Sequence, residues 1–372
     1  MEKELDNLLS KPASYYKNLI LKNNKKFYFN KPVVLFGAAK LSPHFIKYFV
    51  NKGTQILSLS DNDKNKIGKK LFRLMIINKK DALKKFGKNI QVVVTSVHYE
   101  EIIQKLKKIG FCNVFNPMYF FTLDSKFFNL LTWKNNINSI FKNKKKIKLV
   151  FSFFKDEESK KVYINIIRFR LTFDISVFNK IKDNNSEYFD KKIIKLSPKE
   201  VFLDGGDYDG DTIKMFIKKS KNIFNKIYAF EPDDKNFIQL NKYINKLSDE
   251  RIISYKIGLG KIKEKLHFTN EGNLQSKITN KSKILIKILP IDFLKDIIFT
   301  YIKLDIEGFE KQALIGAIKT INKYKPKLAI CVYHNIEDLW EIPYLINKVN
   351  KNYKFYLRHY TNFLFDTICY AT

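Results

Sequence analysis

The stretch VFLDGGDYDGDT, residues 201–212, decides the fold of the second half of this sequence. A short apolar run ends in Asp204. Gly205, Gly206 and Gly210 then let the backbone turn tightly and approach a ligand without obstruction by a Cβ atom. This order predicts a strand, a glycine-rich loop and a helix, as at the ligand-binding edge of a doubly wound α/β sheet.

The same loop is strongly acidic. Its four aspartates make it unfavourable for a phosphate group; they are Asp204, Asp207, Asp209 and Asp211. Its glycines also lack the GxGxxG spacing of dinucleotide-binding loops. A positively charged sulfonium with an amino-acid tail fits this setting better than a nicotinamide dinucleotide does.

A second motif, YAFEP at residues 228–232, ends the next expected strand. Glu231 lies about 20 residues beyond the glycines, where an acidic residue accepts hydrogen bonds from both ribose hydroxyls of a nucleoside. Taken alone, an acidic residue at a strand end more often caps the following helix. The two motifs together favour a cofactor that contains a nucleoside.

The third motif is YIKLDIEGFEKQALIGA, residues 301–317. It brings Asp305 to the carboxyl edge of the sheet, where a carboxylate can orient a hydroxyl group, accept its proton or hold a cation. Glu307 is expected to cap the following helix. Two histidines come later, His334 after the fifth strand and His359 in the sixth. We expect Asp305 and His334 to be catalytic, with His334 as a neutral base, because ligands bind beyond the carboxyl ends of strands. No residue is assigned to a metal.

Several motifs in the same order resemble the FkbM-type methyltransferases, S-adenosylmethionine enzymes that methylate hydroxyl groups, often on sugars. The motifs are DGGDYDGDT, AFEPD, IKLDIEGFEKQAL, YKPKLAICVYH, LRHY and DTICYA, and the resemblance covers approximately residues 150–372. It implies a class I methyltransferase-like, doubly wound sheet of seven strands, the last of them antiparallel. The final two strand candidates have no helix between them, which predicts an antiparallel hairpin at the sheet edge.

The resemblance also implies the cofactor S-adenosylmethionine and its contacts. These are Asp204, Gly206, Gly210 and Glu231, and we include their neighbours Gly205, Asp207, Thr212 and Pro232 in the expected site. At the position of Asp207 the family usually has a small residue, commonly alanine. The expected partner is a sugar, nucleotide-sugar or glycan acceptor.

Strand and helix patterns also alternate in the first third of the chain, with strands expected at 33–36, 55–59 and 91–95. The segment FGAAKLS places Gly37, Ala39 and Ser42 at the positions of a degenerate dinucleotide fingerprint, and Asp61 follows at ribose-binding distance. This part resembles the Rossmann-like N-terminal domains of some sugar-modifying enzymes. It either supports the fold alone or binds a nucleotide or nucleotide-sugar. The expected domains are a helical lead (1–30), a Rossmann-like domain (31–125), a helical connector (126–197) and a methyltransferase domain (198–372).

Composition bears on three further classes: nucleic-acid-binding, membrane-spanning and secreted proteins. The formal net charge is +32, but lysine is spread through nearly every segment without an arginine-rich stripe, so we expect no specific nucleic-acid partner. The N-terminus does not resemble a signal peptide, and no apolar run reaches the roughly 18 residues that cross a bilayer; a cytoplasmic protein is expected. Cys112, Cys331 and Cys369 are expected to be buried, reduced thiols. The sequence does not determine whether the protein forms a homo-oligomer. The alternative function is a nicotinamide oxidoreductase that uses the front domain.

Overall fold

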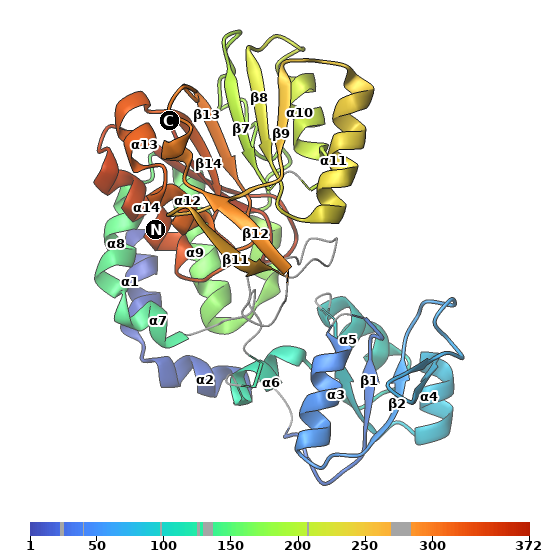
Figure 1. Cartoon of the computed structure of the whole chain (residues 1–372). Helices are drawn as coiled ribbons and strands as arrows, with labels where there is room; N and C mark the ends of the chain where they lie inside the picture. The colour runs from blue at the N-terminus through green and yellow to red at the C-terminus, as the bar shows by residue number, and fades with distance from the viewer. Residues whose placement is uncertain are drawn as a thin grey trace. The chain divides into compact units, whose positions relative to one another are not determined.

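The protein is described by a computed structural model (Figure 1). It describes residues 1–372 apart from 23–25, 40, 97–98, 125–126, 129–136, 207 and 269–283. The chain divides into two compact units: unit 1 contains residues 1–6, 142–167 and 176–372, and unit 2 contains residues 7–141 and 168–175. The chain therefore passes from one unit to the other four times, at 6–7, 141–142, 167–168 and 175–176.

Unit 2 is built around a six-stranded sheet with the order β3-β4-β2-β1-β5-β6. Neighbouring strands are parallel, except for β3 and β4. The sequence revealed β1, β2 and β5 but not the others. The strands are β1 (Val33–Phe36), β2 (Ile56–Ser60), β3 (Lys70–Leu71), β4 (Leu74–Ile77), β5 (Gln91–Val94) and β6 (Asn113–Phe115), and the helices are α2 (Ala13–Lys22), α3 (Ser42–Asn51), α4 (Lys79–Phe86), α5 (Tyr99–Lys108) and α6 (Pro117–Leu123).

Aromatic side chains hold unit 2 together. The ring of Phe27 lies 5.3 Å from that of Phe49, 5.1 Å from that of Phe115 and 5.0 Å from that of Phe120. All four side chains are buried. They come from the segment before β1, from α3, from β6 and from α6. One aromatic cluster therefore joins segments from the beginning and the end of this unit's sequence. Edge-to-face contacts of this kind add to the burial of apolar area.

Unit 1 contains a seven-stranded sheet with the order β15-β16-β14-β13-β7-β8-β9. Strand β16 is antiparallel to both of its neighbours, β14 and β15, and the other neighbouring strands are parallel. The hairpin of β15 and β16 lies at one edge of the sheet, as the sequence predicted, with β15 as the outer strand and β16 paired to β14; β9 forms the other edge. The strands are β7 (Val201–Gly205), β8 (Lys226–Phe230), β9 (Ile252–Tyr255), β13 (Tyr301–Leu304), β14 (Lys327–Cys331), β15 (Phe355–His359) and β16 (Thr367–Ala371).

A smaller sheet of three strands, which the sequence did not reveal, also belongs to unit 1. Its order is β10-β12-β11, with β10 (Gly258–Leu259), β11 (Glu264–Phe268) and β12 (Ile284–Leu289). The helices within this unit are α8 (Lys144–Phe153), α10 (Asp211–Lys219), α11 (Asp234–Leu247), α12 (Glu310–Ile315), α13 (Ile318–Tyr324) and α14 (Asp338–Val349), with the 3-10 turn η3 (Ile291–Phe293). Four further helices contain residues of both units: α1 (Glu2–Ser10), α7 (Ile137–Lys142), α9 (Glu157–Thr172) and the 3-10 helix η2 (Ile175–Lys180).

The order in which the chain adds strands to the large sheet reverses at β7, and this switch point positions the site. The chain leaves β7 through α10 to β8 on one side, while β13 pairs with β7 on the other side. Phe202 of β7 stacks on Phe216 of α10 with ring centroids 4.6 Å apart, which fixes the helix against the strand. In an open α/β sheet, ligands bind beyond the carboxyl ends of the strands at such a switch point.

The structure bears on two expectations drawn from composition, which concern the cysteines and membrane-spanning helices. Cys331 and Cys369 are buried, but Cys112 is exposed, so the prediction of three buried thiols is wrong for Cys112. Among the described residues, no helix has both the length and the apolar character needed to cross a membrane.

Candidate functional site

A buried ion pair underlies the glycine-rich loop. Asp204, at the end of β7, is fully buried, and its Oδ1 lies 2.9 Å from Nζ of Lys303 on the neighbouring strand β13. The Lys303 ammonium also donates a hydrogen bond to the carbonyl oxygen of Gly206 at 2.8 Å. Lysine in a buried strand requires such partners. Lys303 was not predicted as a site residue, although a single lysine inside the apolar run YIKL was a signal for it.

The glycines of the loop are required by protein neighbours. Gly206 has φ +80°, and a Cβ atom there would lie 1.9 Å from the carbonyl oxygen of Asp305. Gly210, with φ +95°, is the N-cap of α10, and its Cβ would lie 2.4 Å from the ring of Tyr243. Both positions exclude a side chain, so the loop passes close to β13 and α11. Asp207 lies outside the described residues.

Glu231 links the loop to the end of β8. Its carboxylate accepts hydrogen bonds from the backbone N–H of Tyr208 at 3.2 Å and of Asp233 at 2.8 Å. It does not cap the following helix, because Asp233 is the N-cap of α11. Burial raises the pKa of Glu231 to about 7, against the opposing effect of the Asp233 N–H. Thr212 is buried in the first turn of α10, and Pro232 directly follows Glu231.

Asp305 follows β13, one strand away from the glycine loop. Its carboxylate accepts hydrogen bonds from the hydroxyl groups of Tyr188, at 2.8 Å, and Tyr333, at 3.2 Å. Burial raises the pKa of Asp305, but the positive charges of His334 and Lys303 and the Tyr188 hydrogen bond outweigh it, so the net shift is downward. Asp305 is therefore a carboxylate at neutral pH, and its side chain keeps 23% of its surface exposed.

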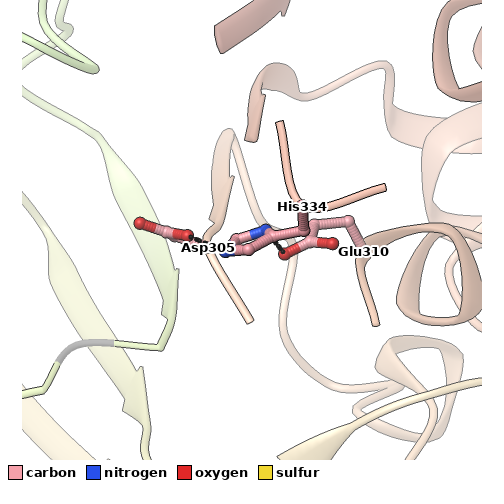
Figure 2. A group of neighbouring side chains, drawn as sticks. All are labelled: Asp305, Glu310 and His334. Atoms are coloured by element: carbon pink, nitrogen blue, oxygen red, sulfur yellow. Dashed lines mark ion pairs between the residues drawn. The ribbon is translucent and has the colours of Figure 1, made fainter. Parts of the chain in front are cut away.

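His334 lies between carboxylates of different residues, as Figure 2 shows for Asp305 and Glu310. Its Nδ1 is 3.0 Å from Oε1 of Glu310, and its Nε2 is 3.5 Å from Oδ1 of Asp305 and 3.5 Å from Oε2 of Glu307. Burial lowers the pKa of His334, but the negative charges of Glu310, Asp305 and Glu307 raise it to about 10. The ring is thus an imidazolium at neutral pH in this arrangement, not the neutral base that the sequence suggested.

Glu307 is not a helix cap, contrary to the expectation from sequence. Helix α12 begins at Glu310 with Phe309 as its N-cap, and Glu307 precedes both in a left-handed turn, with φ +55° followed by +93° at Gly308. Glu310, fully buried, stabilises this turn because its Oε1 accepts hydrogen bonds from the N–H groups of Ile306 and Gly308. Sequence reasoning missed Glu310, although it is the second acidic residue in EGFE.

Further carboxyl groups surround this centre. Burial raises the pKa of Glu187 to about 8, that of Asp338 to about 7 and that of Asp366 to about 6, and neighbouring carboxylates add to each increase. The centre therefore contains more acidic groups than cationic ones. Such an arrangement can attract a positively charged ligand.

His359 has a different environment. It is fully buried, its Nδ1 lies 2.8 Å from Oγ1 of Thr367, and its ring stacks on Phe178 at 4.8 Å. Burial lowers its pKa to about 4. These contacts give His359 a packing role and agree with the preference for His334.

In unit 2, the loop after β1 is closed by its own residues. Gly37 has φ +113°, and Asp61 accepts hydrogen bonds from the N–H of Ala38 at 2.8 Å and of Asp63 at 2.9 Å. The carboxylate expected at a ribose therefore stabilises the loop. A cavity of about 350 Å³ lies elsewhere in this unit, and its walls include Glu100, Lys107, Asn116 and Asp174.

Comparison with known proteins gives two results. The model of the methyltransferase FkbM domain matches residues 204–362. A solved structure described as methyltransferase FkbM from Methylobacillus flagellatus KT aligns with 100% of this chain and 97% of its own, with 21% identity and a TM-score of 0.78. No curated protein matches the sequence significantly.

Two rRNA-methylase structures are less similar. One, from Streptococcus thermophilus, aligns with 47% of this chain and 86% of its own, with 14% identity and a TM-score of 0.31. The other, described as putative and from Clostridium thermocellum, aligns with 50% of this chain and 90% of its own, with 14% identity and a TM-score of 0.32. With TM-scores this low, neither rRNA-methylase structure supports an argument about this chain, whereas the Methylobacillus flagellatus structure shows the fold.

Proposed function

We propose that this chain, whose residues 204–362 form a methyltransferase FkbM domain, transfers a methyl group from S-adenosylmethionine to a hydroxyl oxygen of a sugar or glycan precursor. One observation carries the proposal. The glycine loop, Glu231, Asp305 and His334 follow four strands that adjoin in the sheet, β7, β8, β13 and β14, and all four have their carboxyl ends at the same edge. The strand order also supports a class I methyltransferase-like sheet.

The cofactor site comprises the residues expected from the sequence: Asp204, Gly205, Gly206, Asp207, Gly210, Thr212, Glu231 and Pro232. Glu231 supports this assignment, because its carboxylate is buried, accepts hydrogen bonds from two backbone donors among the described residues, and has a raised pKa. Two ribose hydroxyls would add the donors that a buried carboxylate needs. Lys303 neutralises Asp204, so we assign Asp204 to holding the loop in shape.

The acceptor side of the site is assigned to Asp305 and His334. The cofactor supplies an activated methyl group, and the protein must align an acceptor oxygen behind it. The Asp305 carboxylate can accept a hydrogen bond from that hydroxyl, while Tyr188 and Tyr333 hold it in place. His334, as an imidazolium, keeps Asp305 ionised and positioned.

The alternative function, a nicotinamide oxidoreductase, has no observation in its favour, since Asp61 is engaged in its own loop. Calorimetry on the purified chain tests the choice. We expect S-adenosylhomocysteine to bind with a stoichiometry of one and NADH not to bind. A second assay follows transfer of a radioactive methyl group to candidate sugars, nucleotide-sugars and glycans. NADH binding without S-adenosylhomocysteine binding would reject the proposal.

A further inference from the structure

We propose that Asp305, Glu307 and His334 form a binding site for a divalent metal ion, with Glu310 holding the imidazole in place. The proposal concerns the acceptor side of the site and rests on the proposed function only for what the ion does. The geometry of four side chains carries it, together with the absence of hydrogen bonds at three of their buried polar atoms, Nδ1 and Nε2 of His334 and Oε2 of Glu310.

The imidazole has two nitrogens with different surroundings. Nε2 faces Asp305 Oδ1 and Glu307 Oε2, each at 3.5 Å, whereas Nδ1 faces Glu310 Oε1 at 3.0 Å. Asp305 and Glu310 lie on opposite sides of the ring (Figure 2), so one ion at Nε2 is bound with Asp305 and not with Glu310. A separation of about 3.5 Å suits two ligand atoms that each lie roughly 2.1 Å from a shared ion.

Glu310 completes the arrangement from the other side of the ring. A metal-binding histidine usually donates its second ring N–H to a carboxylate, which fixes the tautomer and the ring plane. Glu310 is fully buried and is itself held by the N–H groups of Ile306 and Gly308. The imidazole is thereby oriented with Nε2 toward Asp305 and Glu307.

The buried polar atoms of this centre point to a missing partner. His334 is only 7% exposed, yet neither ring nitrogen makes a hydrogen bond in the described structure. The Nε2 contacts, at 3.5 Å, are too long, and the 3.0 Å contact of Nδ1 with Glu310 is an ion pair. Oε2 of Glu310 also has no hydrogen-bond partner there. Buried polar atoms are usually satisfied, so each exception requires an explanation. An ion at Nε2 would explain the exception at that atom directly.

The charges of the surroundings favour a cation. Three further carboxyl groups influence this centre electrostatically, those of Glu187, Asp338 and Asp366. Their raised pKa values mean that they are partly protonated in the ion-free protein, and a bound cation would favour their ionised forms, while Lys303 is already paired with Asp204. One imidazole with two carboxylates suits Mn²⁺ or Zn²⁺ better than Ca²⁺, which prefers oxygen ligands alone. In the ion-free state described above, the imidazolium pairs with the same carboxylates, and a bound ion would take the place of its Nε2 proton, which leaves to solvent. The alternative is an imidazolium that never makes this exchange.

On the proposed function, the ion would bind the acceptor hydroxyl and stabilise the oxyanion as its proton leaves to solvent. Metal ions increase the acidity of bound oxygen ligands in this way. The methyl group then moves from sulfur to that oxygen, so the S–C bond breaks, the O–C bond forms, and neutral S-adenosylhomocysteine remains.

Binding of Mn²⁺ to the full-length chain, stripped with a chelator, tests the site through the electron paramagnetic resonance signal of the free ion. We expect the wild type to bind one Mn²⁺, with Zn²⁺ competing. Asp305→Asn, Glu307→Gln and His334→Gln should each weaken binding at least tenfold. Glu337→Gln is the matched control, because it removes one negative charge three residues beyond His334 and outside the site. Glu307 is 35% exposed, so its variant tests the site with little risk to folding.

Each outcome decides the question. No Mn²⁺ binding by the wild type, or equal binding by Glu307→Gln and Glu337→Gln, would overturn the metal site and leave His334 as a positioning residue. Methyl transfer that continues in excess chelator would overturn the ion's part in the reaction while the proposed function stands. A wild type that binds Mn²⁺ but not S-adenosylhomocysteine would retain the site and reject the proposed function.

Discussion

The carboxyl group of Glu231 makes cofactor binding depend on pH. Its pKa of about 7 in the free protein means that protonation competes with the ribose hydroxyls, which need an ionised acceptor. We therefore expect S-adenosylhomocysteine affinity to fall by about tenfold between pH 8 and pH 6, as one proton is taken up. Calorimetry across this range measures the change. Glu231→Gln should bind more weakly at pH 8 and lose the dependence; an unchanged pH profile in this variant would separate Glu231 from the cofactor.

Gly206 offers a second test at the level of single residues. Gly206→Val places a branched side chain where the Cβ alone would lie 1.9 Å from the Asp305 carbonyl, at a φ of +80°. The loop must move away from β13, so we expect S-adenosylhomocysteine binding to be lost. Gly87→Val is the control, because Gly87 also has a positive φ of +77° but no atom near its Cβ position. Circular dichroism checks folding, and normal affinity in a folded Gly206→Val protein would show that the loop shape is irrelevant to binding.

At the level of elements, a buried arginine joins β15 to the helical segment before the sheet. Arg358 is 2% exposed, and its guanidinium lies 2.8 Å from Asp156, 3.2 Å from Glu158, 3.6 Å from Asp183 and 3.5 Å from Asp190. Arg358→Met would leave the buried carboxylates without their cation, so we expect the free energy of unfolding to fall by about 3–5 kcal/mol.

Urea denaturation measures this loss. Lys256→Met is the control, since Lys256 pairs with Asp234 at an exposed site of the same unit, and its loss should cost about 0–1 kcal/mol. Equal effects of the two substitutions would mean that the Arg358 cluster contributes no more than a surface pair.

The sequence predicted elements well wherever local pattern determines structure. The apolar runs at 33–36 and 201–203 lie in β1 and β7, because continuous burial on both faces leaves a clear pattern. Strand β3 has two residues and β11 has only two apolar side chains, so neither gives a strong signal. The position of β16 inside the sheet depends on pairing between distant segments, which periodicity does not report.

The same holds for the candidate site, where residues marked by a local pattern could be predicted from the sequence. Asp204, Glu231 and Asp305 were predicted because each lies at the end of an apolar strand, a feature visible in a short window. The ionisation of His334 was missed because it depends on Glu310 and on the left-handed turn that brings Glu307 near the ring. Three-dimensional neighbours set a pKa, and one sequence does not list them.

At the scale of the whole molecule, the division into units predicts which fragment retains cofactor binding. Residues 142–372 contain all of unit 1 except residues 1–6, which supply the buried Leu5 and an exposed ion pair between Asp6 and Lys148. Loss of Leu5 should lower stability by up to about 3 kcal/mol, whereas the surface pair contributes little. The expected cofactor residues all lie beyond residue 200, so we expect the fragment to fold and bind S-adenosylhomocysteine within about threefold of the full chain, a difference of roughly 0.6 kcal/mol. Calorimetry on both proteins compares them. A folded fragment without affinity would place part of the cofactor site in residues 1–141.

The place of β16 also sets an order of events during synthesis. A ribosome makes β14 and β15 before residues 367–371, yet these residues pair between the two earlier strands. Until they emerge, β14 lacks a neighbour on one side and β15 lacks one altogether within the sheet. A nascent chain therefore carries open strand edges for the time needed to translate the stretch from β15 to β16, and this is the period in which a chaperone would protect it from aggregation.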